Sequence, residues 1–342
     1  MKEKDIREID VNMKENLVQD TENTSWYNLN NKYLKGSAFH NDFERLPKDL
    51  YVSENLEYLK KHPAGMYINF KTNSKSVKVK ASLVGQAYMS HMTAVGTIGF
   101  DIYVKYENKW VFLAATKINS KEYEVEILKN LDEGEKEFRL YFPLYQGLIS
   151  ANVGVDKNSS FEFVDEIKEK AVVYGTSISQ GGCASRPGLA YSSILGRMLD
   201  IEVINLGFSG SCKIEKEMVE VINNIEKKYL ILEVEANSPG VDVLKERLRY
   251  FLDNLVNKES FDIYLISHFD DGMCLVNTAY KNAQKAFYDL QKNYFKDVKF
   301  IDGSALIHNL GYEGTVDGVH LNDLGFYEVA KKLANIITND SL

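Results

Sequence analysis

Residues 171–182, Ala171-Val-Val-Tyr-Gly-Thr-Ser-Ile-Ser-Gln-Gly-Gly182, join a short apolar run to a polar, glycine-rich turn. The run is typical of a strand buried on both faces, and glycine permits the tight backbone that follows it. Downstream, short apolar runs alternate with amphipathic helical stretches as far as the C-terminus. This alternation requires crossover connections, so it predicts a mostly parallel sheet covered by helices on both sides.

The expected strands of this half cover residues 171–174, 201–205, 229–234, 261–267 and 298–301. The expected helices lie near residues 189–199, 214–225, 241–256, 278–294 and 323–337. In open sheets of this kind, ligands bind beyond the carboxyl ends of the strands. We therefore expect the loops that follow the strands to carry the chemistry.

Residues 67–164 follow a two-residue period instead. In Phe100-Asp-Ile-Tyr-Val-Lys-Tyr106 and Phe138-Arg-Leu-Tyr-Phe-Pro-Leu-Tyr145, every second residue from the first phenylalanine is apolar or aromatic. The pattern predicts half-buried antiparallel strands, and several of them at short spacing indicate a β-sandwich or jelly roll. The other face of the second strand would carry Tyr141 and Tyr145, either as a sugar platform or as packing against a neighbouring element.

Composition and charge limit the class of protein. The 342 residues are 44% hydrophobic and 26% charged, which is typical of a soluble globular chain of about two domains. With 41 basic and 49 acidic residues, the formal charge of −8 disfavours a nucleic-acid partner. No apolar run approaches the roughly 18 residues of a membrane span, so no membrane partner is expected. We expect an N-terminal extension over residues 1–25, a β-sandwich over 26–162 and an α/β domain over 163–342.

The first twenty residues lack the continuous apolar core of a secretory signal, which predicts a cytoplasmic protein. The three cysteines, Cys183, Cys212 and Cys274, follow no C-x-x-C spacing. They are interpreted as free thiols, and neither a disulfide framework nor a zinc knuckle is indicated. An acidic chain with 21 tyrosines could form a homodimer.

Polar residues lie where the expected strands end. Ser177 occupies a position suited to a nucleophile, although a polar turn that merely ends the strand fits equally well. The glycines of Asn205-Leu-Gly-Phe-Ser-Gly-Ser211 can offer N–H groups to an anion, and Asn237 adds an amide donor. Asp317-Gly-Val-His320 spaces a carboxylate and an imidazole so that they can hydrogen-bond. Metal ligation by this pair is a rival interpretation, but no further ligand cluster completes a site.

In order and spacing these motifs resemble the four blocks of the SGNH hydrolase superfamily, the GDSL-like esterases. The nucleophile block matches Ser177 in Gly175-Thr-Ser177, where the family usually has Gly-Asp-Ser. The glycine block matches Gly210, with Gly207 as the weaker candidate.

The asparagine block matches Asn237, but Glu235 and Ser238 flank it in place of the usual Gly-x-Asn-Asp pattern. The last block matches Asp317 and His320. These departures leave the triad in place and bear on the subgroup and its substrate pocket.

The resemblance extends upstream and covers most of the chain past about residue 25. His91-Met-Thr-Ala-Val-Gly96 and Gly99-Phe-Asp-Ile-Tyr103 resemble the Gly-x-Asp-Leu-Tyr β-domain that precedes some bacterial SGNH domains. The loop Gln180-Gly-Gly-Cys-Ala-Ser-Arg-Pro-Gly188 resembles the same subgroup. The resemblance implies a flavodoxin-like three-layer α/β/α domain preceded by an all-β, jelly-roll-like sandwich.

The implied activity is that of a serine esterase that needs no cofactor or metal. Ser177 would attack an ester carbonyl, His320 would take its proton, and Asp317 would orient His320. The oxyanion would be bound by the N–H groups of Ser177 and Gly210 and by the amide of Asn237.

Members that resemble this chain often deacylate carbohydrates, so the expected substrate is a short-chain ester, in the first place an acetyl ester, of an oligosaccharide or a small molecule. Arg186, His91, Glu235 and His268 are the candidate substrate contacts. Two alternatives stay open: an acyltransferase that uses the same triad with an alcohol acceptor, and a carbohydrate-binding protein with weak or no catalysis.

Overall fold

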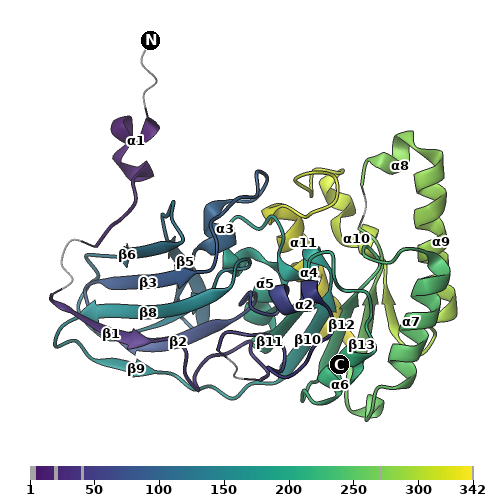
Figure 1. The fold of residues 1–342 in the computed structure, drawn as a ribbon, viewed down its shortest axis with the longest axis horizontal. Helices are drawn as coiled ribbons and strands as arrows, with labels where there is room; N and C mark the ends of the chain where they lie inside the picture. Colours follow the sequence, from purple (N-terminus) through teal and green to yellow (C-terminus); the bar gives the residue numbers. More distant parts are fainter. Residues whose placement is uncertain (1–4, 19–21, 40–41, 270, 341–342) are drawn as a thin grey trace.

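The computed structural model describes residues 5–18, 22–39, 42–269 and 271–340. Figure 1 shows two β-sheets of the N-terminal half lying beside an α/β domain that contains the C-terminal half. The predicted fold class, an antiparallel β region ahead of a parallel α/β domain, is confirmed. Among the helices of the described ranges, none is both long enough and apolar enough to cross a membrane.

Within the described residues, the β-sandwich has nine strands. They are β1 (Thr24–Asn28), β2 (Tyr67–Thr72), β3 (Val77–Leu83), β4 (Asp101–Tyr106), β5 (Lys109–Ala115), β6 (Glu122–Leu128), β7 (Lys136–Tyr141), β8 (Leu148–Asp156) and β9 (Phe161–Phe163). One sheet has the order β1-β8-β3-β6 and the other β5-β4-β7-β2-β9. Apolar side chains that include Ile102, Phe138, Leu140 and Val153 fill the space between them. The two-residue period therefore predicted most of the inward-facing side chains, but Tyr106 at the end of β4 is exposed and Leu144, beyond β7, packs into the core of the α/β domain.

Short helices accompany the sandwich and the segments that lead into it. They are α1 (Ile6–Ile9), α2 (Glu54–Leu59) and α3 (Ala94–Ile98). The segment between β1 and β2 reaches the other domain, because Leu46, Leu56 and Leu59 join the apolar core of the parallel sheet. Residues that precede most of the sandwich in sequence thus complete the α/β domain.

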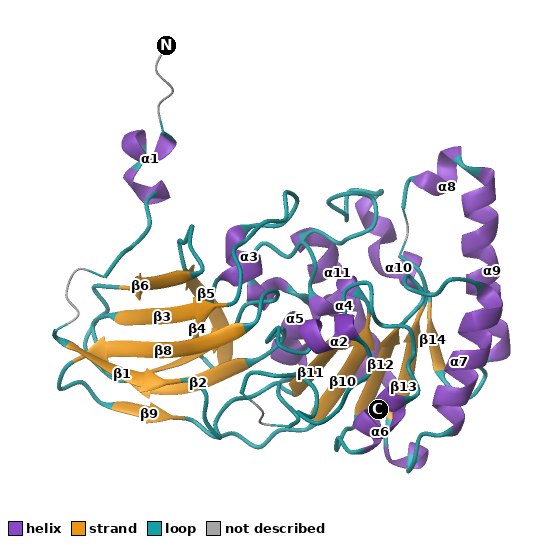
Figure 2. Ribbon diagram, viewed as in Figure 1, coloured by secondary structure: helices purple, strands orange, loops and turns teal. Residues whose placement is uncertain are grey.

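The parallel sheet has the order β11-β10-β12-β13-β14 (Figure 2). Its strands are β10 (Lys170–Gly175), β11 (Glu202–Gly207), β12 (Tyr229–Glu233), β13 (Asp262–Ile266) and β14 (Lys299–Ile301). Each end lies within two residues of the sequence prediction. From β10 the chain adds β11 on one side and then β12 on the other, so the strand order reverses at β10. Such a reversal opens a crevice at the carboxyl end of the strand, where ligands bind in doubly wound sheets.

Helices cover both faces of this sheet. They are α4 (Ser177–Gln180), α5 (Tyr191–Leu199), α6 (Glu217–Asn223), α7 (Val241–Asp253), α8 (Met273–Val276), α9 (Thr278–Tyr294), α10 (Gly303–Ile307) and α11 (Asp323–Asp340). Val173 of β10 faces the core shared with α5 and α11, while its neighbour Val172 faces the core shared with α6 and α7. Successive residues of a strand point to opposite faces, so the continuous apolar runs follow from burial on both sides.

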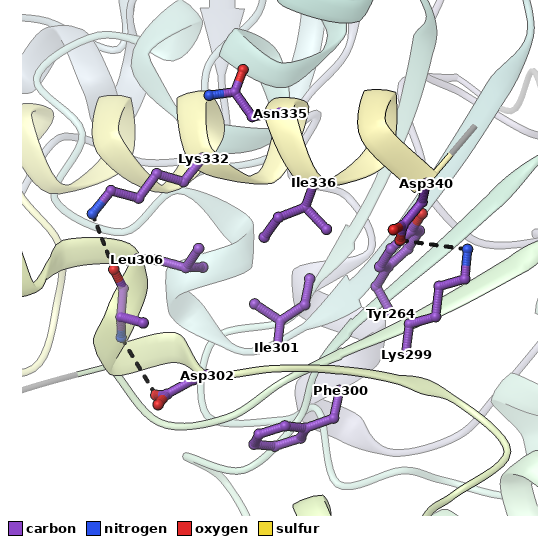
Figure 3. Close-up of a pocket in the computed structure, with 11 residues that line it drawn as sticks. Tyr264, Lys299, Phe300, Ile301, Asp302, Leu306, Lys332, Asn335, Ile336 and Asp340 are labelled. Atoms are coloured by element: carbon purple, nitrogen blue, oxygen red, sulfur yellow. Dashed lines mark hydrogen bonds and ion pairs between the residues drawn. The ribbon is translucent and has the colours of Figure 1, made fainter. Parts of the chain in front are cut away.

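A groove of about 690 Å³ runs beside the edge strand β14 (Figure 3). Phe300 and Ile301 of β14, Tyr264 of β13 and Ile336 of α11 line it. None of the candidate site residues lies in it. The groove therefore lies outside the candidate active site.

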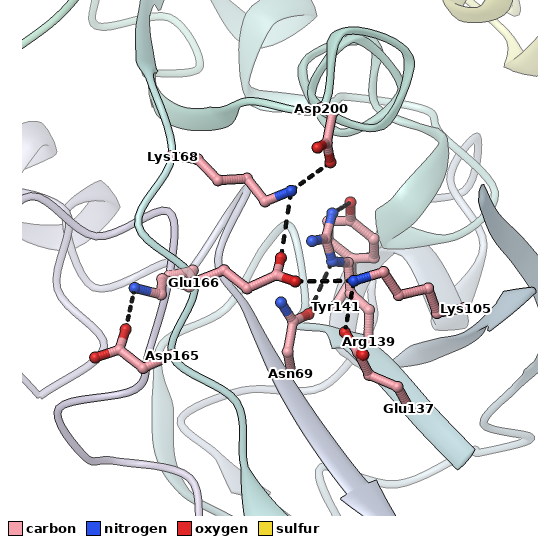
Figure 4. Close-up of polar contacts among 10 residues, drawn as sticks. Asn69, Lys105, Glu137, Arg139, Tyr141, Asp165, Glu166, Lys168 and Asp200 are labelled. Atoms are coloured by element: carbon pink, nitrogen blue, oxygen red, sulfur yellow. Dashed lines mark hydrogen bonds and ion pairs between the residues drawn. The ribbon is translucent and has the colours of Figure 1, made fainter. Parts of the chain in front are cut away.

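Ion pairs join the sandwich to the linker that enters the parallel sheet (Figure 4). Lys105 of β4 donates to Glu137 at 3.1 Å and to Glu166 at 2.8 Å. Glu166 also pairs with Lys168 at 3.2 Å. Burial acts to raise the pKa of Glu166, but the two lysines outweigh it and lower the pKa, so the carboxylate stays charged between them.

Aromatic side chains next to these ion pairs pack between the sandwich and the α/β domain. Tyr141 is only 2% exposed, and its hydroxyl donates to the Ser193 carbonyl of α5 at 3.5 Å. The Arg139 guanidinium stacks over the ring of Tyr67 at 4.1 Å. Tyr145 is also buried. Of the two interpretations of Tyr141 and Tyr145, packing against the neighbouring domain is therefore correct, and an exposed sugar platform is not formed.

Candidate active site

Ser177 is the first residue of α4, directly after β10. Its Oγ lies 2.9 Å from His320 Nε2. Thr176 holds the turn in place, because its N–H and hydroxyl donate to the buried Glu233 carboxylate at 3.1 and 2.7 Å. Thr176, which stands where the related family usually has aspartate, thus anchors the nucleophile turn to the end of β12.

Asp317 and His320 come together in the loop before α11. Asp317 Oδ2 lies 2.8 Å from His320 Nδ1, and Oδ1 accepts the N–H groups of Val319 and His320 at 3.0 and 2.8 Å. Burial acts to raise the pKa of Asp317, but these hydrogen bonds outweigh it and lower the pKa to about 2. A charged carboxylate at Nδ1 favours the tautomer whose Nε2 lone pair accepts the Ser177 proton.

The predicted oxyanion donors lie at the same edge of the sheet. The Ser177 N–H belongs to the first turn of α4, where N–H groups lack an intrahelical acceptor. Gly210 occupies an exposed turn after β11 with φ +67°, a backbone conformation that glycine adopts without strain. Asn237 donates from Nδ2 to the Phe208 carbonyl at 3.4 Å, so its amide lies beside that turn. Binding of an oxyanion by these groups stays a prediction.

Gly207, the weaker glycine candidate, has a packing role. A β-carbon at this position would lie 2.1 Å from the Gln180 nitrogen, so only glycine lets β11 approach α4 this closely. The buried Arg45 guanidinium also donates to the Gly207 carbonyl at 2.5 Å. Between the two candidates, the structure favours Gly210 as the donor.

Glu235 and His268 meet behind the nucleophile turn. The His268 N–H donates to Glu235 Oε2 at 3.0 Å, and the His268 ring lies 2.9 Å from Asp271 Oδ2. Burial raises the pKa of Glu235, while His268 and Gln291 act against it. Both residues line a small enclosed cavity that also includes Ile178 and Val319, the neighbours of Ser177 and His320.

His91 reaches Asp317 and His320 from the sandwich domain. Its Nε2 lies 3.8 Å from Asp317 Oδ2, and its ring centroid is 5.9 Å from that of His320. The side chain keeps 40% of its surface exposed. The structure therefore brings His91 to the candidate site, although its contact with a substrate stays a prediction.

Arg186 is engaged elsewhere. Its Nη1 donates to Asp101 Oδ2 at 2.6 Å and also to the Tyr103 hydroxyl, and its guanidinium stacks on Phe112 at 3.6 Å. The Gly188 N–H donates to both oxygens of the same carboxylate at 3.0 Å. The structure thus gives Arg186 a different partner from the predicted substrate: it ties the catalytic-side loop to the Gly-x-Asp motif of β4.

Cys183, interpreted from the sequence only as a free thiol, also lies at the site. Its Sγ and one ring nitrogen of each of His91 and His320 all lie within 4.8 Å of one another. Burial and the charge of Asp317 raise the pKa of the Cys183 thiol to about 11. Only the folded chain places this thiol beside the predicted catalytic base.

Two family models match the two halves of the chain. The model of the GDSL-like lipase/acylhydrolase family matches residues 168–338, half of the chain. The chain belongs to this family. A second model, GxDLY, describes the N-terminus of SGNH-hydrolase-type esterases and matches residues 24–161 of the same hydrolase.

Solved structures support the assignment. The GDSL-like hydrolase is 31% identical to a GDSL-like lipase from Bacteroides ovatus, with 93% of this chain and 98% of that chain covered and a TM-score of 0.85. A salicylyl-acyltransferase from a tetracycline biosynthetic pathway shares the fold at 16% identity, with 94% and 99% covered and a TM-score of 0.72. So does a family two carbohydrate esterase from Clostridium thermocellum, solved with cellohexaose, at 13% identity, 83% and 98% coverage and a TM-score of 0.51. No curated protein matches the chain.

Proposed function

We propose that this GDSL-like hydrolase is a serine esterase that removes short acyl groups, most simply acetyl, from a carbohydrate. One observation carries the proposal: Ser177, His320 and Asp317 form an unbroken hydrogen-bonded relay with links of 2.9 and 2.8 Å. A nucleophile within hydrogen-bond reach of a base that is itself oriented by a third group is the arrangement that acyl transfer requires.

In the proposed reaction, Ser177 Oγ attacks the ester carbonyl while His320 Nε2 accepts its proton. The tetrahedral oxyanion is stabilised by the N–H groups of Ser177 and Gly210 and by the Asn237 amide. Collapse of the intermediate releases the alcohol, which takes the proton from His320. Water, activated by the same histidine, then hydrolyses the acyl-enzyme and restores Ser177.

We place the acyl group in a small enclosed cavity whose lining includes Ile178 and Val319, the sequence neighbours of Ser177 and His320. Its volume is about 20 Å³, which accommodates a group of roughly methyl or water size. Ile178, Phe269 and Val319 supply its apolar walls, while Glu233 and Glu235 form a buried polar side. A longer acyl chain would have to displace these side chains, and overpacking of this kind costs about 1–3 kcal/mol.

The sandwich domain supports an extended alcohol. His320 returns the proton to the leaving alcohol, so this part of the ester must lie near the exposed His91 from the sandwich. A neutral imidazole offers one donor and one acceptor, which suits the hydroxyl groups of a sugar. The cellohexaose in the carbohydrate esterase of similar fold agrees with this substrate class.

Hydrolysis of p-nitrophenyl acetate, butyrate and octanoate by the wild type and by Ser177→Ala tests the proposal. We expect acetate to be the best substrate and Ser177→Ala to be inactive, after which acetylated xylo- and cello-oligosaccharides form the next panel. Preference for octanoate would refute the acyl assignment, and full activity of Ser177→Ala would refute the nucleophile.

The acyltransferase alternative needs a separate assay, since the same triad can pass the acyl group to an alcohol. Turnover of p-nitrophenyl acetate is followed with and without a sugar acceptor. An acylated sugar formed faster than free acetate would replace hydrolysis by transfer as the activity. Absence of any turnover would favour a binding protein instead.

A further inference from the structure

His91, Cys183 and His320 form a cluster of metal-ligand type at the mouth of the site. One nitrogen of each imidazole and the cysteine Sγ all lie within 4.8 Å of one another. The three residues come from separate parts of the chain: the sandwich loop before α3, the loop after α4 and the loop before α11. Two imidazoles and a thiol form a ligand set that favours Zn²⁺ over the oxygen-seeking cations.

The cluster is close to the dimensions of a zinc site. With Zn–N bonds of about 2.0–2.1 Å and Zn–S bonds of about 2.3 Å, tetrahedral ligand atoms lie about 3.3–3.6 Å apart. The ligand atoms therefore need to approach by little more than 1 Å. The exposed His91 side chain can supply this movement, whereas Cys183 is buried.

A carboxylate already supports one of the ligands. Asp317 holds His320 Nδ1 at 2.8 Å and lies 3.8 Å from His91 Nε2. A carboxylate that orients a ligating histidine is the usual outer partner in zinc sites. The triad would thus supply both a ligand and its support.

We propose that the site binds a thiophilic divalent cation, Zn²⁺ above all, through His91, Cys183 and His320, and that this binding reversibly switches off the serine nucleophile. Binding releases the Cys183 thiol proton to solvent and leaves a thiolate on the metal. His320 has only two ring nitrogens, and both are needed in catalysis, one for Asp317 and one for the Ser177 proton. Whichever nitrogen binds the metal, the imidazole can no longer act as the base. The inhibitory consequence rests on the proposed function, but metal binding itself does not.

Cobalt provides a direct probe of the site. Full-length protein, reduced with a phosphine and freed of metal with a chelator, is titrated with Co²⁺ and its absorption spectrum is recorded. A thiolate-to-cobalt charge-transfer band in the near ultraviolet, with the visible bands of a tetrahedral ion, is expected. Because this measurement needs no turnover, it tests the site even if the chain hydrolyses no ester.

Cys183→Ala and Cys274→Ala form a matched pair, since Cys274 lies on α8 outside the cluster. Cys183→Ala should lose the charge-transfer band and keep its metal-free turnover of p-nitrophenyl acetate, while its inhibition constant for Zn²⁺ rises at least about tenfold. Cys274→Ala should behave as wild type. His91→Gln should weaken Co²⁺ binding, read from the spectrum alone.

Three results would each overturn the proposal. They are the absence of a thiolate band in the wild type, an unchanged band in Cys183→Ala, and equal Zn²⁺ inhibition of wild type and Cys183→Ala. Turnover without metal binding would leave the proposed function intact and refute only the metal site. A cobalt–thiolate band without turnover would support the metal site and refute the proposed function.

Discussion

Replacing Arg186 by methionine distinguishes an interdomain anchor from a substrate contact. The carboxylate of Asp101 has no exposed surface, and Arg186 pairs with it at 2.6 Å while keeping 18% of its own side chain exposed. Removing the guanidinium leaves a fully buried charge with only the Gly188 N–H as a donor partner among those described. Breaking a buried ion pair in this way costs about 3–5 kcal/mol of unfolding free energy.

Replacing the other partner of the pair, Asp101, should lower the free energy of unfolding by less. Asp101→Asn leaves the charge on Arg186, which reaches water, and an asparagine oxygen can still accept the Gly188 N–H. We expect a loss of about 1.5–3 kcal/mol, the usual contribution of a hydrogen bond to a charged group. Arg186→Met combined with Asp101→Leu should be more stable than Arg186→Met alone, since no charge is then buried.

Urea unfolding, monitored at several pH values beside the KM for p-nitrophenyl acetate, measures both effects. Burial raises the pKa of Asp101 even with Arg186 present, so loss of Arg186 should raise it further. When the pKa of a carboxyl group is higher in the folded than in the unfolded state, the free energy of unfolding falls as the pH rises above the pKa of the unfolded state. The destabilisation of Arg186→Met should therefore shrink toward pH 5. An unchanged unfolding midpoint with a raised KM would refute this reasoning and return Arg186 to the substrate pocket.

Three further predictions concern the site. Asp317→Asn should lower kcat by up to about 10⁴-fold in stopped-flow or steady-state assays, because the neutral amide no longer fixes the His320 tautomer; a loss below tenfold would contradict the assigned role. Asn237→Ala should lower kcat by about 10²–10³-fold with little change in KM, whereas a pure KM effect would exclude an oxyanion donor. Burial raises the pKa of Glu233 to about 7 against hydrogen bonds from Thr176 and Ser179 that act to lower it. The free energy of unfolding should therefore fall by about 3 kcal/mol as the pH rises from below 4.5 to above 7. In Glu233→Gln this pH dependence of the unfolding free energy should disappear. An equal pH dependence in both proteins would show that Glu233 is charged when folded.

The local pattern of apolar and polar residues in the sequence predicted most of the fold. The predicted strands of the parallel sheet end within two residues of the observed ones, since a strand buried on both faces leaves an uninterrupted apolar run. The helix predicted near residues 278–294 is α9, Thr278–Tyr294. Several sandwich strands were recognisable from a period of two, which is clearest in β6, where buried and partly exposed residues alternate.

The sequence also pointed to the hydrogen-bonded residues of the candidate site. Asp317 and His320 lie three residues apart, so their pairing depends on a local turn. Ser177 is 143 residues from His320. Ser177 follows a strand carboxyl end, where ligands bind, whereas the loop that carries His320 follows α10, so only the fold brings the two together. The order of the blocks then led to the family.

The sequence by itself determined the two architectures, the family and the three residues of the relay, because each leaves a signal in neighbouring positions. Only the tertiary structure decided how distant charges and rings are paired. Arg186 meets a carboxylate 85 residues away, and His91 meets Cys183 and His320 across the domain boundary. A surface arginine, an interface arginine and a substrate-binding arginine look alike in sequence, since the free energy of an ion pair depends on burial and distance. Those two quantities exist only once the sandwich has packed against the parallel sheet.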